Sequence, residues 1–171
     1  SIFGTKLRSS ISGQVKIHID DSHSITLATN ESCHVTHALF YEGAINYEFT
    51  DVFIELIKDA KSFLDIGSNI GYFSLVANAF NPEIKTYAFE PGKGPSYYLK
   101  KNLALNNCKN SHAVVEAMSD HIGTVNFHEI RNDKFPYLEH YLSGASSTVN
   151  KYAHLPTNTY EVNCNTLDNF V

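Results

Sequence analysis

The sequence predicts an α/β fold, in which a parallel β-sheet carries helices on both faces and follows an N-terminal β-hairpin. Patterns typical of strands and of helices alternate between residues 47 and 118, at the spacing of βαβ units. The stretch FLDIGSNIGYFS places two glycines where the first of these strands gives way to a helix. We therefore divide the chain into a β-rich extension, 1–46, and a larger domain, 47–171.

Composition narrows the class of protein. The 171 residues, 43% of them hydrophobic, suffice for one domain with a substantial core. The net charge is −5 and the longest basic cluster is Lys100-Lys101, so we predict no nucleic-acid partner. No apolar run approaches the length of a membrane span, and no secretory leader is visible, so we predict no membrane partner. The odd, scattered cysteines predict a reducing compartment, the cytoplasm, and no zinc site.

The N-terminal region predicts a hairpin followed by a less regular segment. Apolar and polar residues alternate over 15–19 and over 25–27, and the turn formers DDSH lie between them. Residues 33–45 predict another short strand and a loop through Gly43.

The elements after residue 47 follow from changes of hydrophobic period. The predicted order is a helix at 49–61, a strand at 62–66, a helix at 70–80, a strand at 85–89, a helix at 95–105 and a strand at 112–118. Asn81-Pro82 ends one helix and Pro95 suits the first turn of the next. The pattern then returns to strands at 124–130 and 159–166, joined through a loop, 140–156, long enough to be a functional lid.

The glycine stretch predicts a ligand site at the carboxyl end of the first parallel strand. Glycine there lets the main chain approach a ligand, and the helix that follows offers unpaired amides. A dinucleotide-binding loop would have glycine at Asn69 and at Tyr72, which this chain lacks. Asp65 would repel a pyrophosphate but suits a ligand with a cationic, amino-acid-like end.

The ends of the next two strands extend this site. Glu90 follows the second strand, close to the spacing at which an acid accepts hydrogen bonds from ribose hydroxyls. At Glu116-Ala117-Met118 an adenine could rest its face on the methionine. An amino-acid end, a ribose and a base together describe S-adenosylmethionine (SAM). The predicted cofactor-binding residues are Asp65, Gly67, Ser68, Asn69, Gly71, Glu90, Pro91, Glu116, Ala117 and Met118.

The same stretches resemble a known family. FLDIGSNIGYFS, YAFEPG, NLALNN, EAMSDHIGTVNF, SGASSTVN and VNCNTLDNFV are similar to successive blocks of the FkbM-type class I SAM-dependent methyltransferases, from about Tyr47 to Val171. The resemblance implies a Rossmann-like sheet that binds SAM, and methyl transfer to a hydroxyl of a sugar or secondary metabolite. It implies a small-molecule or carbohydrate acceptor. It places Asp65 and the loop residues at the methionine end, Glu90 at the ribose and Glu116-Ala117 at the adenine.

The chain departs from that family at its C-terminal end. The family continues past the TLD block into further strands, so we expect the C-terminal strands of the sheet to be missing here. The chain also starts at Ser1 without a methionine, and we expect it to be a piece of a longer protein. The general base is expected in the 140–156 loop or in the missing half.

Other interpretations stay open. The glycines could form only a tight turn, Glu90 could cap a helix, and Glu116 could be solvated surface. His34-x-x-His37 would form a metal pair only on a helix, and we predict no metal. Candidates for the base that could equally be surface residues are His121, His128, His140 and His154.

Two alternative functions remain. One is an NAD-dependent oxidoreductase, which the altered glycine pattern disfavours. The other is a non-enzymatic ligand-binding or interaction fragment whose sheet another chain completes; a homo-oligomer is also possible.

Overall fold

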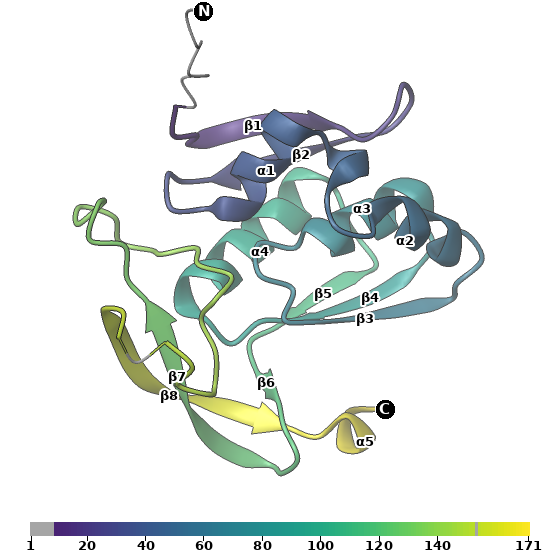
Figure 1. The fold of residues 1–171 in the computed structure, drawn as a ribbon. Helices are drawn as coiled ribbons and strands as arrows, with labels where there is room; N and C mark the ends of the chain where they lie inside the picture. Colours follow the sequence, from purple (N-terminus) through teal and green to yellow (C-terminus); the bar gives the residue numbers. More distant parts are fainter. Residues whose placement is uncertain (1–8, 153) are drawn as a thin grey trace, which may run out of the picture.

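The computed structural model describes residues 9–152 and 154–171 (Figure 1). The first eight residues of the predicted extension and residue 153 of the predicted 140–156 loop lie outside the described residues. The strands form a two-stranded sheet, β1-β2, and two three-stranded sheets, β3-β4-β5 and β6-β8-β7. In Figure 1 the parallel sheet β3-β4-β5 lies between the hairpin and helices on one side and the β6-β8-β7 sheet on the other.

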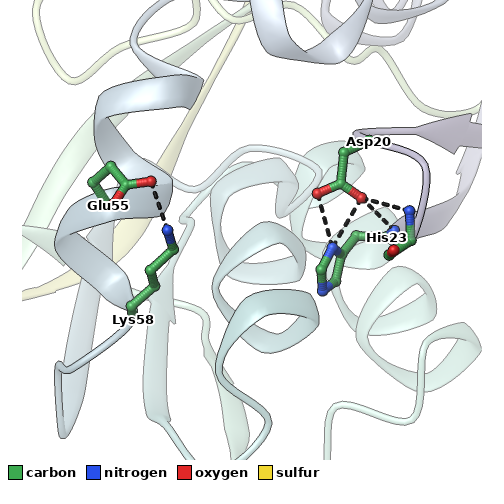
Figure 2. Close-up of polar contacts among 5 residues, drawn as sticks. Asp20, His23, Glu55 and Lys58 are labelled. Atoms are coloured by element: carbon green, nitrogen blue, oxygen red, sulfur yellow. Dashed lines mark hydrogen bonds and ion pairs between the residues drawn. The ribbon is translucent and has the colours of Figure 1, made fainter.

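The predicted N-terminal hairpin is confirmed. Strands β1 (Gly13–His18) and β2 (Ser24–Thr29) pair antiparallel. In the turn, the Asp20 carboxylate accepts hydrogen bonds from the backbone amides of Ser22 and His23, at 2.8 and 2.6 Å, and contacts His23 Nδ1 at 2.9 Å (Figure 2). The contact with the His23 ring lowers the pKa of Asp20.

The prediction of a short strand and loop over 33–45 is wrong, because this segment is helical. Helix α1 (His34–Glu42) and the 3-10 helix η1 (Ala44–Asn46) follow the hairpin. Thr36 and Leu39 are buried three residues apart, and the Thr36 hydroxyl donates to Thr29 Oγ1 at 2.9 Å. Helix α1 ends at Gly43, whose φ of 88° favours glycine and whose N–H donates to the Leu39 carbonyl at 3.2 Å.

His34 and His37 therefore lie on a helix, which is the arrangement that a metal pair at this spacing requires. Over residues 9–152 and 154–171, no group of three His, Cys, Asp or Glu side chains is placed to hold a metal ion. The His37 ring instead contacts the Tyr41 ring, with centroids 4.7 Å apart.

The βαβ architecture is confirmed. Helices α2 (Thr50–Ile57), α3 (Tyr72–Phe80) and α4 (Lys93–Leu105) alternate with strands β3 (Ser62–Ile66), β4 (Lys85–Phe89) and β5 (Ser111–Val114). The three strands are parallel, in the order β3-β4-β5. On the exposed side of α2, Lys58 Nζ pairs with Glu55 at 2.6 Å (Figure 2).

The prediction of one strand over 112–118 is wrong in its second half. The amide of Glu90, the residue after β4, donates to the carbonyl of Val114, the last residue of β5, at 3.0 Å. The chain then leaves this sheet through Val115 and Glu116. Strand β6 (Ala117–Met118) pairs in parallel with β8, in the other three-stranded sheet.

Helices lie on both faces of the parallel sheet, as predicted, but they cover the two faces unequally. Helices α2, α3 and α4 share one face, where Phe63 packs against Phe53 of α2 with centroids 5.0 Å apart. On the other face the one-turn helix α5 (Leu167–Phe170) places the Phe170 ring 4.8 Å from the Phe89 ring. Among the described residues β3 pairs only with β4, and Ile66 on this edge strand is 54% exposed.

Two asparagines, one in α4 and one directly after it, join the hairpin to the parallel sheet. Asn102 is fully buried; its Oδ1 accepts from the Ala28 amide at 2.7 Å and its Nδ2 donates to the Ile70 carbonyl at 2.8 Å. One turn later, Asn106 accepts from the Thr26 amide and donates to the Thr26 carbonyl, at 2.8 and 2.7 Å. These side chains satisfy backbone groups of β2 that a neighbouring strand would otherwise pair.

The predicted pair of C-terminal strands is also confirmed. Strands β7 (Gly123–Ile130) and β8 (Thr157–Asn165) pair antiparallel. The long connection between them turns back onto β7, where His128 and Ser147 exchange backbone hydrogen bonds of 2.9 and 3.2 Å. The predicted loop is thus held against the edge of the second sheet.

The cysteines and the helices bear on two expectations, a reducing compartment and no membrane partner. Cys33, Cys108 and Cys164 are free and buried, and burial raises the pKa of the Cys108 thiol to about 11. Within the part of the chain that the structure describes, no helix is both long enough and apolar enough to cross a bilayer.

Candidate functional site

A cavity of about 330 Å³ lies where the chain leaves the carboxyl ends of β3 and β4. Parallel strands end together at one edge of a sheet, so the turns that follow them meet there. Seven of the ten predicted cofactor residues line the cavity: Gly67, Asn69, Glu90, Pro91, Glu116, Ala117 and Met118.

The glycine loop is fixed to the end of β4 by its own backbone. The amides of Gly67 and Ser68 both donate to the Phe89 carbonyl, at 2.9 and 3.0 Å. The Asn69 amide donates to Glu90 Oε2 at 2.9 Å. Gly67 has a φ of 78°, and a Cβ built there would meet nothing within 4 Å, so conformation rather than space requires glycine.

A second cavity, of about 190 Å³, adjoins the first. Gly67, Asn69 and Gly144 line both cavities, while Asp65 and Ser68 line only the smaller one. Asn69 Oδ1 is shielded from solvent and has no hydrogen-bond partner in the described structure. A buried acceptor without a donor is costly, and a ligand N–H or O–H would satisfy it.

Asp65 lies beneath the loop and is 8% exposed. Its Oδ2 accepts a hydrogen bond of 2.6 Å from the Ser74 hydroxyl, in the first turn of α3. Burial raises the pKa of Asp65, and the bond from Ser74 opposes that effect. Asp65 therefore also supports the start of α3.

Gly71 lines neither cavity. Its φ is 88°, and a Cβ built there would lie 2.6 Å from Leu99 Cδ1 of α4. Close packing of α4 against the start of α3 thus accounts for this glycine. The place of Gly71 among the cofactor-binding residues stays a prediction.

Glu90 is the most heavily constrained ionisable group of the site. It is 6% exposed, and its Oε1 accepts from the Gly92 amide at 2.8 Å while its Oε2 accepts from the Asn69 amide. Burial raises the pKa of Glu90 to about 7, the two amides oppose this, and Asp65 and Glu129 add repulsion. Because a carboxylate offers about four acceptor positions, two remain for hydroxyl donors in the cavity.

The wall opposite the parallel sheet comes largely from residues outside the predicted set. Phe127 of β7 lines the cavity, together with Ser143, Gly144, Ser146, Ser147 and Thr148 of the long loop. The serine-rich composition of the 140–156 loop pointed to a lid. The alternation of β7 indicates that Phe127 shares a face with Glu129. It does not indicate which part of the fold that face meets.

The four histidines considered as a general base lie elsewhere in the described structure, and none of them lines this cavity. His121 pairs with Asp120 at 2.8 Å on an exposed turn, and His128 Nδ1 lies 2.9 Å from Thr159 Oγ1. The His140 ring packs on Tyr97, with centroids 4.7 Å apart.

The chemistry of the walls favours an uncharged or cationic ligand. Among the described residues, neither cavity is lined by lysine or arginine, whereas Asp65, Glu90 and Glu116 contribute carboxylates. Ile66, Phe89 and Phe127 add apolar surface. Such a site can hold a flat apolar group and accept hydrogen bonds from hydroxyl or ammonium donors.

No family model and no curated protein sequence matches this chain. It is similar to the solved structure of a SAM-dependent methyltransferase from Agrobacterium tumefaciens, with a TM-score of 0.43 and 11% identity over 64% of this chain and 34% of that one. This chain thus spans about a third of the Agrobacterium protein. It is also similar to M. jannaschii TYW2 in complex with AdoMet, with a TM-score of 0.40 and 14% identity over 78% of this chain and 71% of that one. A third similar structure is precorrin-6y C5,15-methyltransferase from Geobacter metallireducens GS-15, with a TM-score of 0.34 and 11% identity over 85% of this chain and 92% of that one.

Proposed function

We propose that this protein binds SAM and belongs to the SAM-dependent methyltransferases. The observation that carries the proposal is Glu90, a buried carboxylate at the end of β4 that lines a cavity and is oriented by the Asn69 and Gly92 amides. A carboxylate held in this way can accept hydrogen bonds from the two hydroxyls of a ribose.

The rest of the cavity fits the other parts of that cofactor. Met118 and Phe127 offer apolar contact for an adenine. The adjoining cavity, with Asp65 and the unpartnered Asn69 Oδ1, offers acceptors for an ammonium group. The proposed cofactor residues are those predicted from the sequence. Among them, Gly71 would contribute by letting α4 pack closely against the start of α3.

The lining also argues against the oxidoreductase alternative. NAD carries a pyrophosphate, which binding loops neutralise with helix N-termini and close glycine contacts. Asp65 and Glu90, both buried near the loop, would repel it, and no lysine or arginine of the described cavity lining compensates.

SAM supplies an electrophilic methyl group. The chain's own residues would align the cofactor and limit water, with the 143–148 segment covering one side of the cavity. On the resemblance to the FkbM-type enzymes, we propose O-methylation of a hydroxyl on a small molecule or carbohydrate, in the cytoplasm.

Isothermal titration calorimetry with S-adenosylhomocysteine, SAM and NAD tests the proposal. We expect S-adenosylhomocysteine to bind and NAD not to bind. We expect Glu90→Ala to weaken binding about tenfold or more, since a charge-assisted hydrogen bond contributes about 1.5–3 kcal/mol. The control Glu161→Ala alters an exposed glutamate of β8 and should bind like the wild type. Preferential binding of NAD, or equal binding by Glu90→Ala, would contradict the proposal.

A second candidate is an interaction module whose sheet is completed by another strand. The observation that favours it is β3, an edge strand in the described structure; Ile66, its last residue, is 54% exposed and also lines the cavity. Light scattering separates the two candidates. Self-association that Ile66→Lys abolishes, in a protein that binds no S-adenosylhomocysteine, would support the module.

A further inference from the structure

The second sheet places another buried carboxylate close to Glu90. Glu129 of β7 is 8% exposed, and its Oε1 accepts a hydrogen bond of 3.1 Å from the hydroxyl of Tyr160 on β8. Tyr160 pairs directly with Phe127, so it is a diagonal neighbour of Glu129 across the strand pair. Burial raises the pKa of Tyr160 above its usual range, so the hydroxyl keeps its proton and donates to Glu129.

The Tyr160 hydroxyl also reaches the turn that carries Glu90. It accepts a hydrogen bond of 3.0 Å from the Lys93 amide, at the start of α4, and the Lys93 ammonium lies 4.4 Å from the centre of the Tyr160 ring. The preceding amide, Gly92, donates to Glu90 Oε1. A chain of hydrogen bonds thus runs from Glu129 through Tyr160 to the turn that orients Glu90.

This turn has little room to move. A Cβ built on Gly92 would lie 2.9 Å from Glu90 Oε1 and 3.3 Å from Phe127 Cε1. The space beside the Gly92 Cα is therefore filled by the carboxylate that the turn orients and by the Phe127 ring of β7. A shift of β7 or β8 would displace the hydrogen-bond donor of Glu90.

We propose that Glu129 and Tyr160 are positioning residues that hold the Gly92–Lys93 turn, and through it the Glu90 carboxylate, in its ligand-binding orientation. The proposal deepens the function proposed above and rests on it for the nature of the ligand. In this proposal the β6-β8-β7 sheet both lines the cavity and orients the carboxylate that binds the cofactor.

Electrostatics gives this arrangement a measurable signature. Charged and titratable groups near Glu90 come from each element around it: Asp65 of β3, Lys93 of α4, Glu116 before β6, Glu129 of β7 and Tyr160 of β8. Burial is the largest cause of the raised pKa of Glu90, and the charges of Asp65 and Glu129 raise it further. Removing the charge of Glu129 should lower the pKa of Glu90. Two ribose hydroxyls need both carboxylate oxygens of Glu90 as acceptors. Cofactor affinity should therefore rise with the fraction of Glu90 that is deprotonated.

The first test needs no ligand. Carboxyl ¹³C chemical shifts of the ligand-free protein, titrated with pH, report the midpoint of Glu90, and Glu90→Gln assigns the signal. We expect a midpoint near 7 in the wild type and a lower one in Glu129→Gln, whereas Glu161→Gln on the exposed side of β8 should leave it unchanged. An unchanged midpoint in Glu129→Gln would contradict the close approach of the two carboxylates on which the role of Glu129 rests.

The second test measures S-adenosylhomocysteine affinity at pH 8, where Glu90 is deprotonated. Tyr160→Phe keeps the ring but removes the hydroxyl, and we expect about 3- to 10-fold weaker binding, the effect of one hydrogen bond. Tyr137→Phe, at a 69% exposed tyrosine, is the control and should bind normally. Unchanged affinity in Tyr160→Phe would overturn the positioning role. Failure of the wild type to bind would overturn the proposed function, and the carboxyl titration would still decide the role of Glu129.

Discussion

The two walls of the cavity are built in different ways. The wall from the β3 and β4 turns is held by backbone hydrogen bonds, such as those from Gly67 and Ser68 to the Phe89 carbonyl. The wall from β7 and the long loop combines both kinds of contact: His128 and Ser147 exchange backbone hydrogen bonds, and the Ser146 hydroxyl accepts from the Ile130 amide at 3.0 Å. Backbone contacts form with almost any side chain, whereas side-chain contacts depend on one residue each.

Burial separates the loop from the strand ends. Phe89 and Glu90 of the first wall are buried, as is Phe127 of β7, whereas Gly144 and Thr148 of the loop are exposed. We infer that the strand-end residues of the first wall are part of the folding core, and that the loop of the second wall can change with a small loss of stability. Substitutions in the first wall should therefore lower stability, and substitutions in the second should chiefly alter ligand binding.

The largest expected effect comes from Gly71→Ala. The new Cβ would adopt an unfavourable positive φ and lie 2.6 Å from Leu99 Cδ1. Left-handed backbone and overpacking together should lower the free energy of unfolding by about 3–4 kcal/mol. Gly67→Ala is the matched control, because it has the same sign of φ but open space, and should cost only about 1–2 kcal/mol. Urea denaturation measures both; equal losses would show that packing at Gly71 is unimportant.

The next-largest expected effect is a change in the free energy of unfolding with pH, caused by Glu90. Its folded-state pKa, about 7, is above the usual value of 4.5, so its contribution to stability is complete below pH 4.5 and is lost as the pH rises through 7. The loss should be at most about 3 kcal/mol. Unfolding curves between pH 4.5 and 8.5 should show this decline, and Glu90→Gln should reduce its slope. Asp65, also raised, should leave a residual slope of the same sign. An undiminished slope in Glu90→Gln would assign the decline to other groups.

The loss of stability caused by Asn102→Leu should be the next largest. It would leave the Ala28 amide and the Ile70 carbonyl without partners, and a loss of about 2–3 kcal/mol is expected for two buried groups. Asn106→Leu removes similar bonds at a less buried position, where water can replace them, and should cost about 1 kcal/mol. Thermal unfolding of the two variants measures the difference. If Asn106→Leu were the more damaging, the hairpin would be anchored mainly at its turn end.

The difference between the walls also explains how much the sequence could predict. The βα turns are local: strand, glycine loop and helix follow one another within twelve residues of FLDIGSNIGYFS. The carboxyl ends of parallel strands meet at one edge, so the sequence predicts Glu90 and the glycine loop at one ligand site. The structure puts them in hydrogen-bond contact, at 2.9 Å.

The second wall depends on contacts between distant residues. Phe127 and Glu129 read as ordinary alternating positions of a strand, and only the packing of β7 against the Gly92 turn gives them a place in the site. The 33–45 segment was mispredicted for a related reason. Its helix is stabilised by burial of Leu39 and by the bond from Thr36 to Thr29, which no period within the segment shows clearly.

The smallest expected change in stability tests the second wall directly. Ser146→Ala removes the acceptor of the Ile130 amide at a half-buried position, so unfolding free energy should fall by less than about 1 kcal/mol. Because Ser146 lines the cavity, its loss should loosen the loop over the ligand and raise the dissociation rate of S-adenosylhomocysteine, measured by stopped-flow displacement. Ser22→Ala, in the exposed turn of the β1-β2 hairpin and outside both cavity linings, is the control for a lost serine hydroxyl. A stability loss in Ser146→Ala as large as that of Asn102→Leu would place both walls in one folding core and remove the distinction between them.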